Sequence, residues 1–129
     1  AKKHNVTPLA KIVGHFTHSQ QPAWNTTAPI GAIQGLLHKI NWHKDDVDLY
    51  EINEAFAIVT MAAMKDLDLP HEKVNVHGGA CALGHPIGAS GARLLVTLLY
   101  ALRQKKLKRG IASLCIGGGE ATALAIELI

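Results

Sequence analysis

The sequence predicts an α/β domain with a mixed, mainly parallel five-stranded sheet, covered by helices and ending in an antiparallel hairpin. Three observations support this fold class. Strand-like and helix-like apolar patterns alternate along the chain, which is typical of parallel strands joined by right-handed crossovers. Three consecutive glycines, 117–119, separate the last two strand-like segments and indicate a tight turn. The length of 129 residues corresponds to one domain.

The predicted elements follow one another in the order β, α, β, α, β, α, β, β. Leu9–His18 has the apolar residues of a strand, and a polar, proline-containing loop follows it. Thr27 is a candidate N-cap for a helix over Pro29–Ile40, where apolar residues recur at three- and four-residue spacing. The remaining predicted elements are a strand over Val47–Ile52, a helix from Glu54 to about Leu67 capped by Asn53, a strand over Lys73–Val76, a long loop with five glycines over His77–Gly91, a helix from Ala89 or Ser90 to about Lys105, and hairpin strands over Gly110–Ile116 and Ala121–Leu128.

Two of the helical segments, Ala55–Met64 and Leu94–Leu102, have no polar face. A helix that is apolar all round is buried on all sides, whereas a one-sheet domain of this length leaves one face of each helix in water. The sequence therefore predicts that something outside this chain covers at least one of these helices. The alternative is a compact domain whose helix faces are only partly exposed.

Composition and charge exclude several classes of protein. The longest strongly apolar stretch is far shorter than the ~20 residues that cross a bilayer, so we expect no membrane span. The residues 1–5 have no apolar core behind them, so we expect no secretion signal. The basic run 103–109 follows a helix and is interpreted as a solvated helix end, with a phosphate or nucleic-acid site as the alternative. No aromatic residue interleaves with it, so we expect no nucleic-acid partner.

Asn53-Glu54-Ala55-Phe56 lies where a predicted strand ends and a helix begins. In parallel α/β sheets, ligands bind at the carboxyl ends of strands. Asn53 has two interpretations: its side chain caps the helix, or its amide holds a water molecule or a substrate oxygen.

His85 lies in the glycine-rich loop between Gly84 and Pro86, just before a helix. This rigid setting is unusual for a structural histidine and favours a catalytic base or an oxyanion donor. The loop matches neither the phosphate-binding loop nor the dinucleotide fingerprint. His77, Cys81 and His85 are candidate zinc ligands, but glycines interrupt the spacing and no fourth ligand is evident, so we expect no metal.

Cys115 ends a predicted buried strand and precedes the glycine turn. A thiol beside exposed backbone N–H groups suits acid–base or nucleophilic chemistry, and a small buried core thiol is an equally good interpretation of its position. The chain has only one other cysteine, which excludes a disulfide scaffold and favours a reducing compartment.

Together, Asn-Glu-Ala-Phe at 53–56, Gly-His-Pro-Ile-Gly-Ala-Ser-Gly-Ala-Arg at 84–93 and Cys-Ile-Gly-Gly-Gly at 115–119 resemble the C-terminal half of a thiolase. Thiolases make or cleave 3-ketoacyl-CoA by Claisen chemistry. The resemblance covers about Leu9 to Ile129 and implies a three-layer thiolase-like half, with residues 1–129 forming the C-terminal domain. It also implies that the apolar helix at 94–102 packs between the two halves of the fold.

The resemblance assigns a role to four residues. His85 resembles the histidine that activates the nucleophilic thiol and donates to the thioester oxygen. Cys115 resembles the cysteine that moves a proton at the α-carbon of the acyl group. Asn53 resembles the residue holding the water that shares an oxyanion hole with the histidine, and Gly117 resembles the glycine whose N–H helps form the other oxyanion hole. Residues that bind coenzyme A are not identified.

This chain departs from the family's pattern in three ways. Ala121 stands where a glycine is frequent, and residues 25–28 read Asn-Thr-Thr-Ala where many thiolases have Met-Gly. The family's acyl-accepting cysteine lies in its N-terminal half, and Cys81 does not match that motif. We therefore interpret the chain as a fragment or separately expressed domain that is inactive alone and needs the N-terminal half as its partner.

The resemblance also implies a substrate, an assembly and a compartment. Coenzyme A thioesters are the expected substrates, no bound cofactor is expected, and the parent enzyme is expected to be a homodimer or homotetramer. The expected compartment is the cytoplasm, with the mitochondrial matrix and the peroxisome as alternatives. Two other functions are kept as alternatives: a non-catalytic module for acyl-CoA or lipid binding or for assembly, and a ketoacyl synthase-type condensing enzyme. The second is disfavoured because those enzymes usually have a His-Gly-Thr type motif at the position of Asn53 and lack a terminal catalytic cysteine.

Overall fold

The structure is a computed structural model that describes residues 1–129, apart from the side chain of Lys2. Its strands are β1 (Ala10–Ser19), β2 (Leu49–Ile52), β3 (Arg109–Ile116) and β4 (Glu120–Leu128). Its α-helices are α1 (Ala28–Ile40), α2 (Ala57–Leu67), α3 (Ala80–Leu83) and α4 (Ser90–Lys105). Short 3₁₀ turns lie at η1 (Lys2–His4), η2 (Pro22–Thr27), η3 (Lys44–Asp46) and η4 (His71–Lys73).

In the described part of the chain, four strands form one mixed sheet in the order β1-β4-β3-β2. β4 pairs antiparallel with both β1 and β3, and β2 pairs parallel with β3. The prediction of a mainly parallel five-stranded sheet is therefore wrong, while the closing antiparallel hairpin is confirmed. β1, β2 and β3 do run in one direction, as crossovers require. The last strand lies between two of them, and this insertion makes both of its ladders antiparallel.

The predicted fifth strand at 73–76 is reduced to one parallel bridge between Tyr50 and Val74. Asn75 leaves the extended conformation, with φ at 48°, and its side chain replaces the ladder. The Asn75 amide donates to the Ile52 carbonyl oxygen at 2.8 Å, and its Oδ1 accepts from the Ile52 N–H at 2.8 Å. The edge of β2 is thus satisfied by a side chain, so no further strand residue is needed there.

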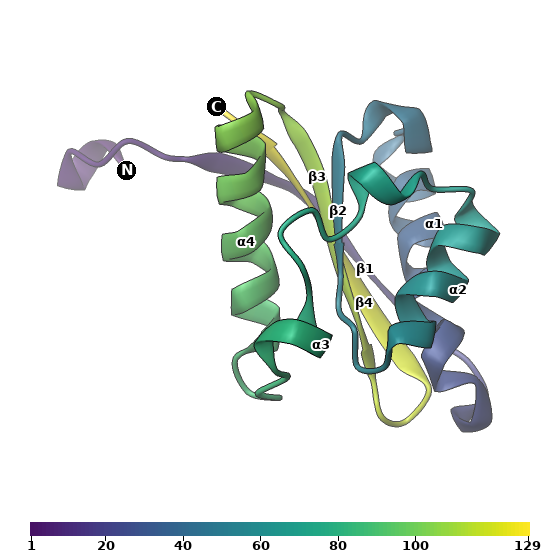
Figure 1. Ribbon diagram of the computed structural model, residues 1–129. Helices are drawn as coiled ribbons and strands as arrows, with labels where there is room; N and C mark the ends of the chain where they lie inside the picture. The colour runs from purple at the N-terminus through teal and green to yellow at the C-terminus, as the bar shows by residue number, and fades with distance from the viewer.

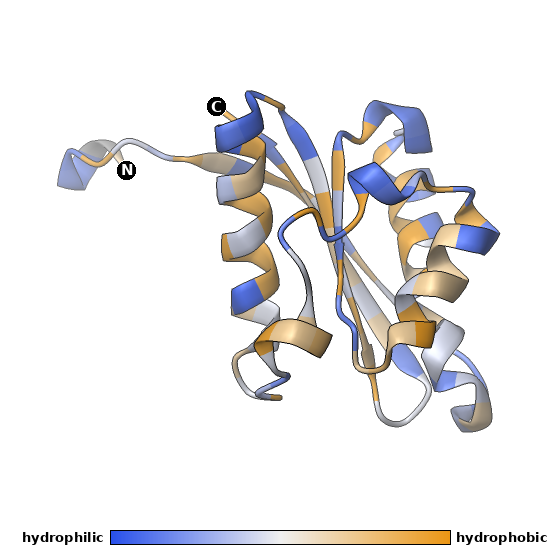
Figure 2. Ribbon diagram, in the orientation of Figure 1, coloured by the Kyte–Doolittle hydropathy of each residue, from blue (hydrophilic) through white to orange (hydrophobic). Residues whose placement is uncertain are grey.

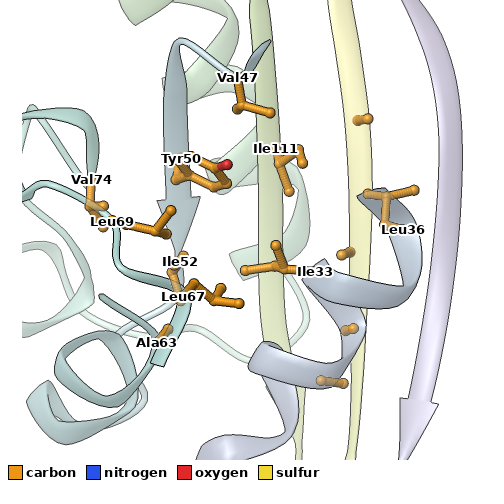
Figure 3. Close-up of a cluster of buried hydrophobic side chains, with 14 of the residues drawn as sticks. Ile33, Leu36, Val47, Tyr50, Ile52, Ala63, Leu67, Leu69, Val74 and Ile111 are labelled. Atoms are coloured by element: carbon orange, nitrogen blue, oxygen red, sulfur yellow. The ribbon is translucent and has the colours of Figure 1, made fainter. Parts of the chain in front are cut away.

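The sheet is the middle of three layers, with α1 and α2 on one face and α4 on the other (Figure 1). The apolar cluster beneath α1 and α2 contains Ile33, Leu36, Tyr50, Ile52 and Ile111, all almost fully buried (Figure 3). A second cluster lies beneath α4, whose leucines at positions 94, 98 and 102 are also fully buried. The hydropathy colouring marks apolar residues along the central strands and on α4 (Figure 2). Burial of these two faces holds the sheet between its helices.

The structure corrects the start of the second helix. α2 begins at Ala57, three residues later than expected, and Phe56 occupies its N-cap position. Asn53 is not a cap: its N–H donates to the Ser113 carbonyl oxygen at 2.9 Å and so extends the β2–β3 pairing. Asn53 therefore belongs to the end of a strand, which places its side chain at the carboxyl edge of the sheet. The other long helices lie within a residue of their predicted bounds.

Both apolar helices leave apolar side chains in water. On α4, Leu94 and Leu98 are buried, whereas Val96 is 56% exposed. On α2, Ile58 and Met61 are 56% and 57% exposed. That another chain or segment covers these faces remains a prediction. Within the described residues, no helix has both the length and the apolar character that a membrane crossing requires.

Candidate active site

The three motifs meet at one end of the sheet. Residues 53–56 follow β2, residues 84–89 lead into α4, and the turn 117–119 follows β3 (Figure 1). These segments surround a cavity of about 430 Å³, lined by Asn25, Thr26, Ala55, Phe56, His85, Ile87, Leu114, Cys115, Ile116 and Gly117. Three of the four predicted site residues, His85, Cys115 and Gly117, thus line one cavity. Its apolar wall and few polar groups are typical of a site for a small organic ligand.

The His85 ring is held by hydrogen bonds on both of its nitrogens. Its Nδ1 lies 2.6 Å from Ser90 Oγ, and its Nε2 lies 3.4 Å from Asn53 Nδ2. Ser90 is buried at the start of α4, and its hydroxyl also donates to the Pro86 carbonyl oxygen at 3.1 Å. The residues that begin the helix therefore fix the ring, while His85 itself is exposed at the cavity.

Asn53 is fully buried and does not line the cavity. Besides the contact with His85, its Oδ1 accepts a hydrogen bond from Arg93 Nη2 at 3.4 Å. Arg93 Nη1 donates to Glu51 Oε2 at 3.2 Å, and these two side chains form an ion pair. The fourth predicted site residue therefore connects the cavity histidine to a buried charged pair.

Sequence reasoning missed Glu51 and Arg93. Glu51 is only 1% exposed, and burial raises the pKa of its carboxyl to about 7, although Arg93 acts in the opposite direction. A signal was available: Glu51 is the one charged residue in a strand of four buried residues, Leu49–Ile52. A buried carboxyl needs a partner, and this partner comes from a helix 42 residues away in the chain.

Glu54 connects the end of β2 to the glycine-rich loop. Its carboxylate accepts from the Cys81 N–H and from the Asn75 amide, each at 3.0 Å. Burial by itself would raise the pKa of Glu54, but these hydrogen bonds outweigh it and the pKa is lowered. A side chain at Gly79 would overlap this carboxyl, since a Cβ there would lie 2.3 Å from Glu54 Cδ. The loop also contains the short helix α3, which the sequence analysis did not predict.

Cys115 and Gly117 line the cavity from the end of β3 and the turn that follows it. Cys115 is half-buried and pairs with Ala121 of β4, and burial raises the pKa of its thiol. Gly117 is exposed at the start of the turn. The thiol therefore carries its proton at neutral pH, facing the same cavity as a histidine.

Cys81 lies apart from this group. It is exposed, and it lines a different cavity with Glu54 and Met61. In the part of the chain that the structure describes, no three His, Cys, Asp or Glu side chains gather where they could hold a metal ion.

A protein-family model described as "Thiolase, C-terminal domain" matches residues 6–128. The chain belongs to the thiolase family. A probable acetyl-CoA acetyltransferase of Dictyostelium discoideum is 50% identical over 127 residues, covering 98% of this chain and 31% of the relative. An acetyl-CoA acetyltransferase of Thiocystis violacea is 49% identical over 127 residues, covering 98% and 32%.

Solved thiolase structures are similar over the same length. The Bacillus anthracis acetyl-CoA acetyltransferase superposes with a TM-score of 0.96 at 48% identity, covering 99% of this chain and 32% of that one. Human mitochondrial 3-ketoacyl-CoA thiolase in complex with CoA gives a TM-score of 0.96 at 46% identity, with coverage of 99% and 32%. The chain thus spans about a third of the length of the thiolases it matches.

Proposed function

We propose that this chain supplies the C-terminal part of the catalytic centre of a thiolase, which transfers an acyl group to or from coenzyme A. The reaction is Claisen condensation of acyl-CoA or thiolysis of a 3-ketoacyl-CoA. The observation that carries this proposal is the convergence of three separate motifs on one cavity, with Asn53 behind His85. The names of the relatives support coenzyme A thioesters as substrates, and no bound cofactor takes part in the proposed chemistry.

His85 is the proposed base for an acyl-accepting thiol. Its Nδ1 is engaged by Ser90, so Nε2 is the nitrogen that takes the thiol proton. Cys81 lies outside the cavity, and Cys115 resembles the family's proton-transferring cysteine rather than its acyl-accepting one, so neither is assigned as the nucleophile. The nucleophile is therefore assigned to a segment outside residues 1–129, and that segment is the proposed partner of this site.

Cys115 is the proposed acid and base at the α-carbon. In condensation, its thiolate takes a proton from the α-carbon of the acyl group, and the electron pair of the broken C–H bond forms the enolate. In thiolysis, the thiol returns that proton to the enolate carbon and becomes the thiolate. Burial raises the pKa of Cys115, which favours the protonated form that thiolysis requires.

Charge on the thioester oxygen is the main obstacle in both directions. Asn53 and His85 are the proposed donors, through a bound water and Nε2–H, to the enolate oxygen. The N–H of Gly117 is a proposed donor to the tetrahedral acyl intermediate. A single fixed donor of this kind contributes about 2.7–4 kcal/mol in other enzymes. His85 and Gly117 line one cavity, and Asn53 contacts His85 from behind, which supports the assignment.

The exposed apolar face of α4 is the proposed contact with the N-terminal half. Val96 and Tyr100, both about half-exposed, mark this face. A homodimer or homotetramer in the cytoplasm remains the proposal for the whole enzyme. The chain matches only about a third of each relative, which supports a further segment as the partner of this face.

A chimera tests the proposed reaction. Residues 1–129 replace the matching segment of a solved acetyl-CoA acetyltransferase relative, and thiolysis of acetoacetyl-CoA is measured. We expect activity within about tenfold of the host, and a loss of about 10²–10⁴-fold in the His85→Ala chimera. Cys81→Ala is the matched control and retains activity. A folded chimera that binds acetoacetyl-CoA without turnover would overturn the proposal and favour the non-catalytic module.

The chain alone provides a second test. We expect no thiolysis of acetoacetyl-CoA by purified residues 1–129, because the proposed nucleophile is not among its cysteines. Turnover by this chain, abolished in Cys81→Ala, would contradict the assignment of the nucleophile.

A further inference from the structure

Arg93 lies between the buried carboxylate of Glu51 and the amide of Asn53. Glu51 and Asn53 are two residues apart in an extended segment, so their side chains project from the same face of the sheet, toward α4. Arg93 is in the first turn of α4, and its two terminal nitrogens reach one acceptor each, at 3.2 and 3.4 Å. None of the roles proposed above uses Arg93 or Glu51.

We propose that Arg93 is a positioning residue that fixes the orientation of the Asn53 amide and, through it, the nitrogen on which His85 carries its proton. A guanidinium has five N–H donors and no acceptor. The Asn53 atom that faces Arg93 must therefore be the oxygen, and the amide NH₂ must face His85. An NH₂ group donates, so the His85 Nε2 that it meets is the unprotonated nitrogen.

The other side of the ring imposes the same proton position. Ser90 Oγ donates its hydrogen to the Pro86 carbonyl oxygen at 3.1 Å and keeps its lone pairs for His85. The proton of the neutral imidazole therefore lies on Nδ1, which is 2.6 Å from Ser90 Oγ. Arg93 and Ser90, both on the first turn of α4, thus specify one tautomer from opposite sides of the ring.

This tautomer is the one that removal of the thiol proton needs, and only that significance rests on the proposed function. Once Nε2 has taken that proton, it is the N–H donor to the enolate oxygen. Nε2 must hold a lone pair to accept a thiol proton. If the Asn53 amide were turned over, its oxygen would face His85 and would favour a proton on Nε2, which would block that step. The 3.4 Å contact between Asn53 and His85 is longer than an ordinary hydrogen bond, so it orients the ring without tightly engaging the lone pair.

Stability does not explain the Glu51–Arg93 pair. Glu51 Oε1 has no hydrogen-bond partner among the described residues, and a partly satisfied buried ion pair contributes little to folding. Glu51 is only 1% exposed, and burial raises the pKa of its carboxyl even beside Arg93, as expected for a carboxyl in an unfavourable environment. The buried carboxylate of Glu51 instead holds the guanidinium of Arg93 in place beside the Asn53 oxygen.

Nitrogen-15 NMR of the 129-residue chain measures the tautomer directly. With labelled histidine, the shifts of Nδ1 and Nε2 show which nitrogen of neutral His85 carries the proton, and His85→Gln identifies the signals among the eight histidines. We expect the Nδ1-protonated form in the unaltered chain and a shift toward the Nε2-protonated form in Arg93→Met. Arg93→Lys keeps a donor without an acceptor and should restore most of the original form.

Two further variants separate positioning from folding. Arg93→Met alone leaves Glu51 as an unpaired buried charge, so the double variant Glu51→Gln/Arg93→Met removes both charges. Glu51→Gln alone retains an acceptor for Arg93 and should keep the original tautomer. Arg103→Met is the matched control on the exposed end of α4, where Arg103 stacks on Tyr100 at 5.5 Å. A folded double variant that keeps the Nδ1-protonated form would overturn the proposal.

Kinetics in the chimera keeps this inference distinct from the proposed function. Arg93→Met should lower kcat by about 10²-fold, the effect of a misplaced catalytic group, and change KM much less. An inactive chimera with an Arg93-dependent tautomer would sink the proposed function and support the positioning role. An active chimera whose tautomer and kcat do not change in Arg93→Met would support the proposed function and overturn the positioning role.

Discussion

At the carboxyl end of β2 the two faces of the sheet have opposite chemistry, although Leu49 at the start of the strand is apolar on the α4 side. Tyr50 and Ile52 point into the apolar cluster beneath α1 and α2 (Figure 3). Glu51 and the following Asn53 point toward α4, where Arg93 meets both. Successive side chains of a strand alternate between its faces, so one segment can build a core on one side and a polar site on the other.

The difference teaches which face stabilises the fold. Apolar burial needs no particular geometry and favours folding in proportion to area. The polar face requires a buried carboxylate with one oxygen unpaired, which disfavours folding. We therefore attribute the buried Glu51 carboxylate to the arrangement of Arg93 and Asn53 that it produces, and not to stability. Truncation on the apolar face should therefore lower stability, whereas substitution of Asn53 on the other face should lower activity.

Ile52→Ala should have the largest effect, and it should be on stability. Ile52 is fully buried in the cluster beneath α1 and α2, so truncation removes apolar contacts and leaves a cavity. We expect a loss of about 2–5 kcal/mol in the free energy of unfolding, measured by urea denaturation. In the chimera, the kcat of the folded fraction should not change. A large drop in kcat would show that the two faces are not separable.

Asn53→Asp should affect activity rather than stability. The substitution keeps an oxygen for Arg93 and replaces the NH₂ that faces His85 with a second oxygen. Loss of one donor at the developing negative charge should lower thiolysis by the chimera about 10²–10³-fold. Urea denaturation should show a much smaller change than Ile52→Ala. Activity within a fewfold of the parent chimera would remove Asn53 from the proposed oxyanion site.

The sequence predicts the individual helices and strands better than the order in which the strands pair. The hairpin strands and α4 lie where their patterns place them, because apolar spacing and the glycine turn are local signals. The place of β4 between β1 and β3 is not a local property, so the pattern β, α, β suggested too many parallel pairs. The strand expected at 73–76 failed because the Asn75 side chain takes over the hydrogen bonds of an edge.

The site divides in the same way. Asn53, His85 and Cys115 lie in short motifs, and the fact that each borders a glycine-rich turn or a strand end made them recognisable. Arg93 lies in the same run as His85, yet nothing local says that it reaches Glu51, 42 residues away. Long-range partners of buried charges are set by packing, and packing is what the sequence patterns leave open.

The pH dependence of stability should report on Glu51. Burial raises its pKa from 4.5 to about 7, so between these values the folded chain binds more protons than the unfolded chain. The free energy of unfolding should therefore fall as pH rises from about 4.5 to about 7, by on the order of 3 kcal/mol. Urea denaturation at pH 5 and pH 8 measures this fall. Subtracting the values for Glu51→Gln from those for the parent chain removes the contributions of groups that both proteins share. A constant difference would mean that Glu51 stays ionised throughout.

The smallest effect on stability is expected at the outer face of α4, which should instead control association. Val96 is 56% exposed, while Leu98, two residues further along the helix, is fully buried. Val96→Lys should change the free energy of unfolding by no more than about 0.5 kcal/mol, as is usual for surface positions.

The unaltered chain should bind a hydrophobic dye or self-associate, because apolar side chains of α2 and α4 are in water. Val96→Lys should reduce both dye binding and self-association. Leu98→Ala is the contrast: it should unfold more easily and should not reduce dye binding. If the unaltered chain is a monomer that binds no dye, its exposed helix faces need no cover, and the proposed contact with an N-terminal half loses its physical basis.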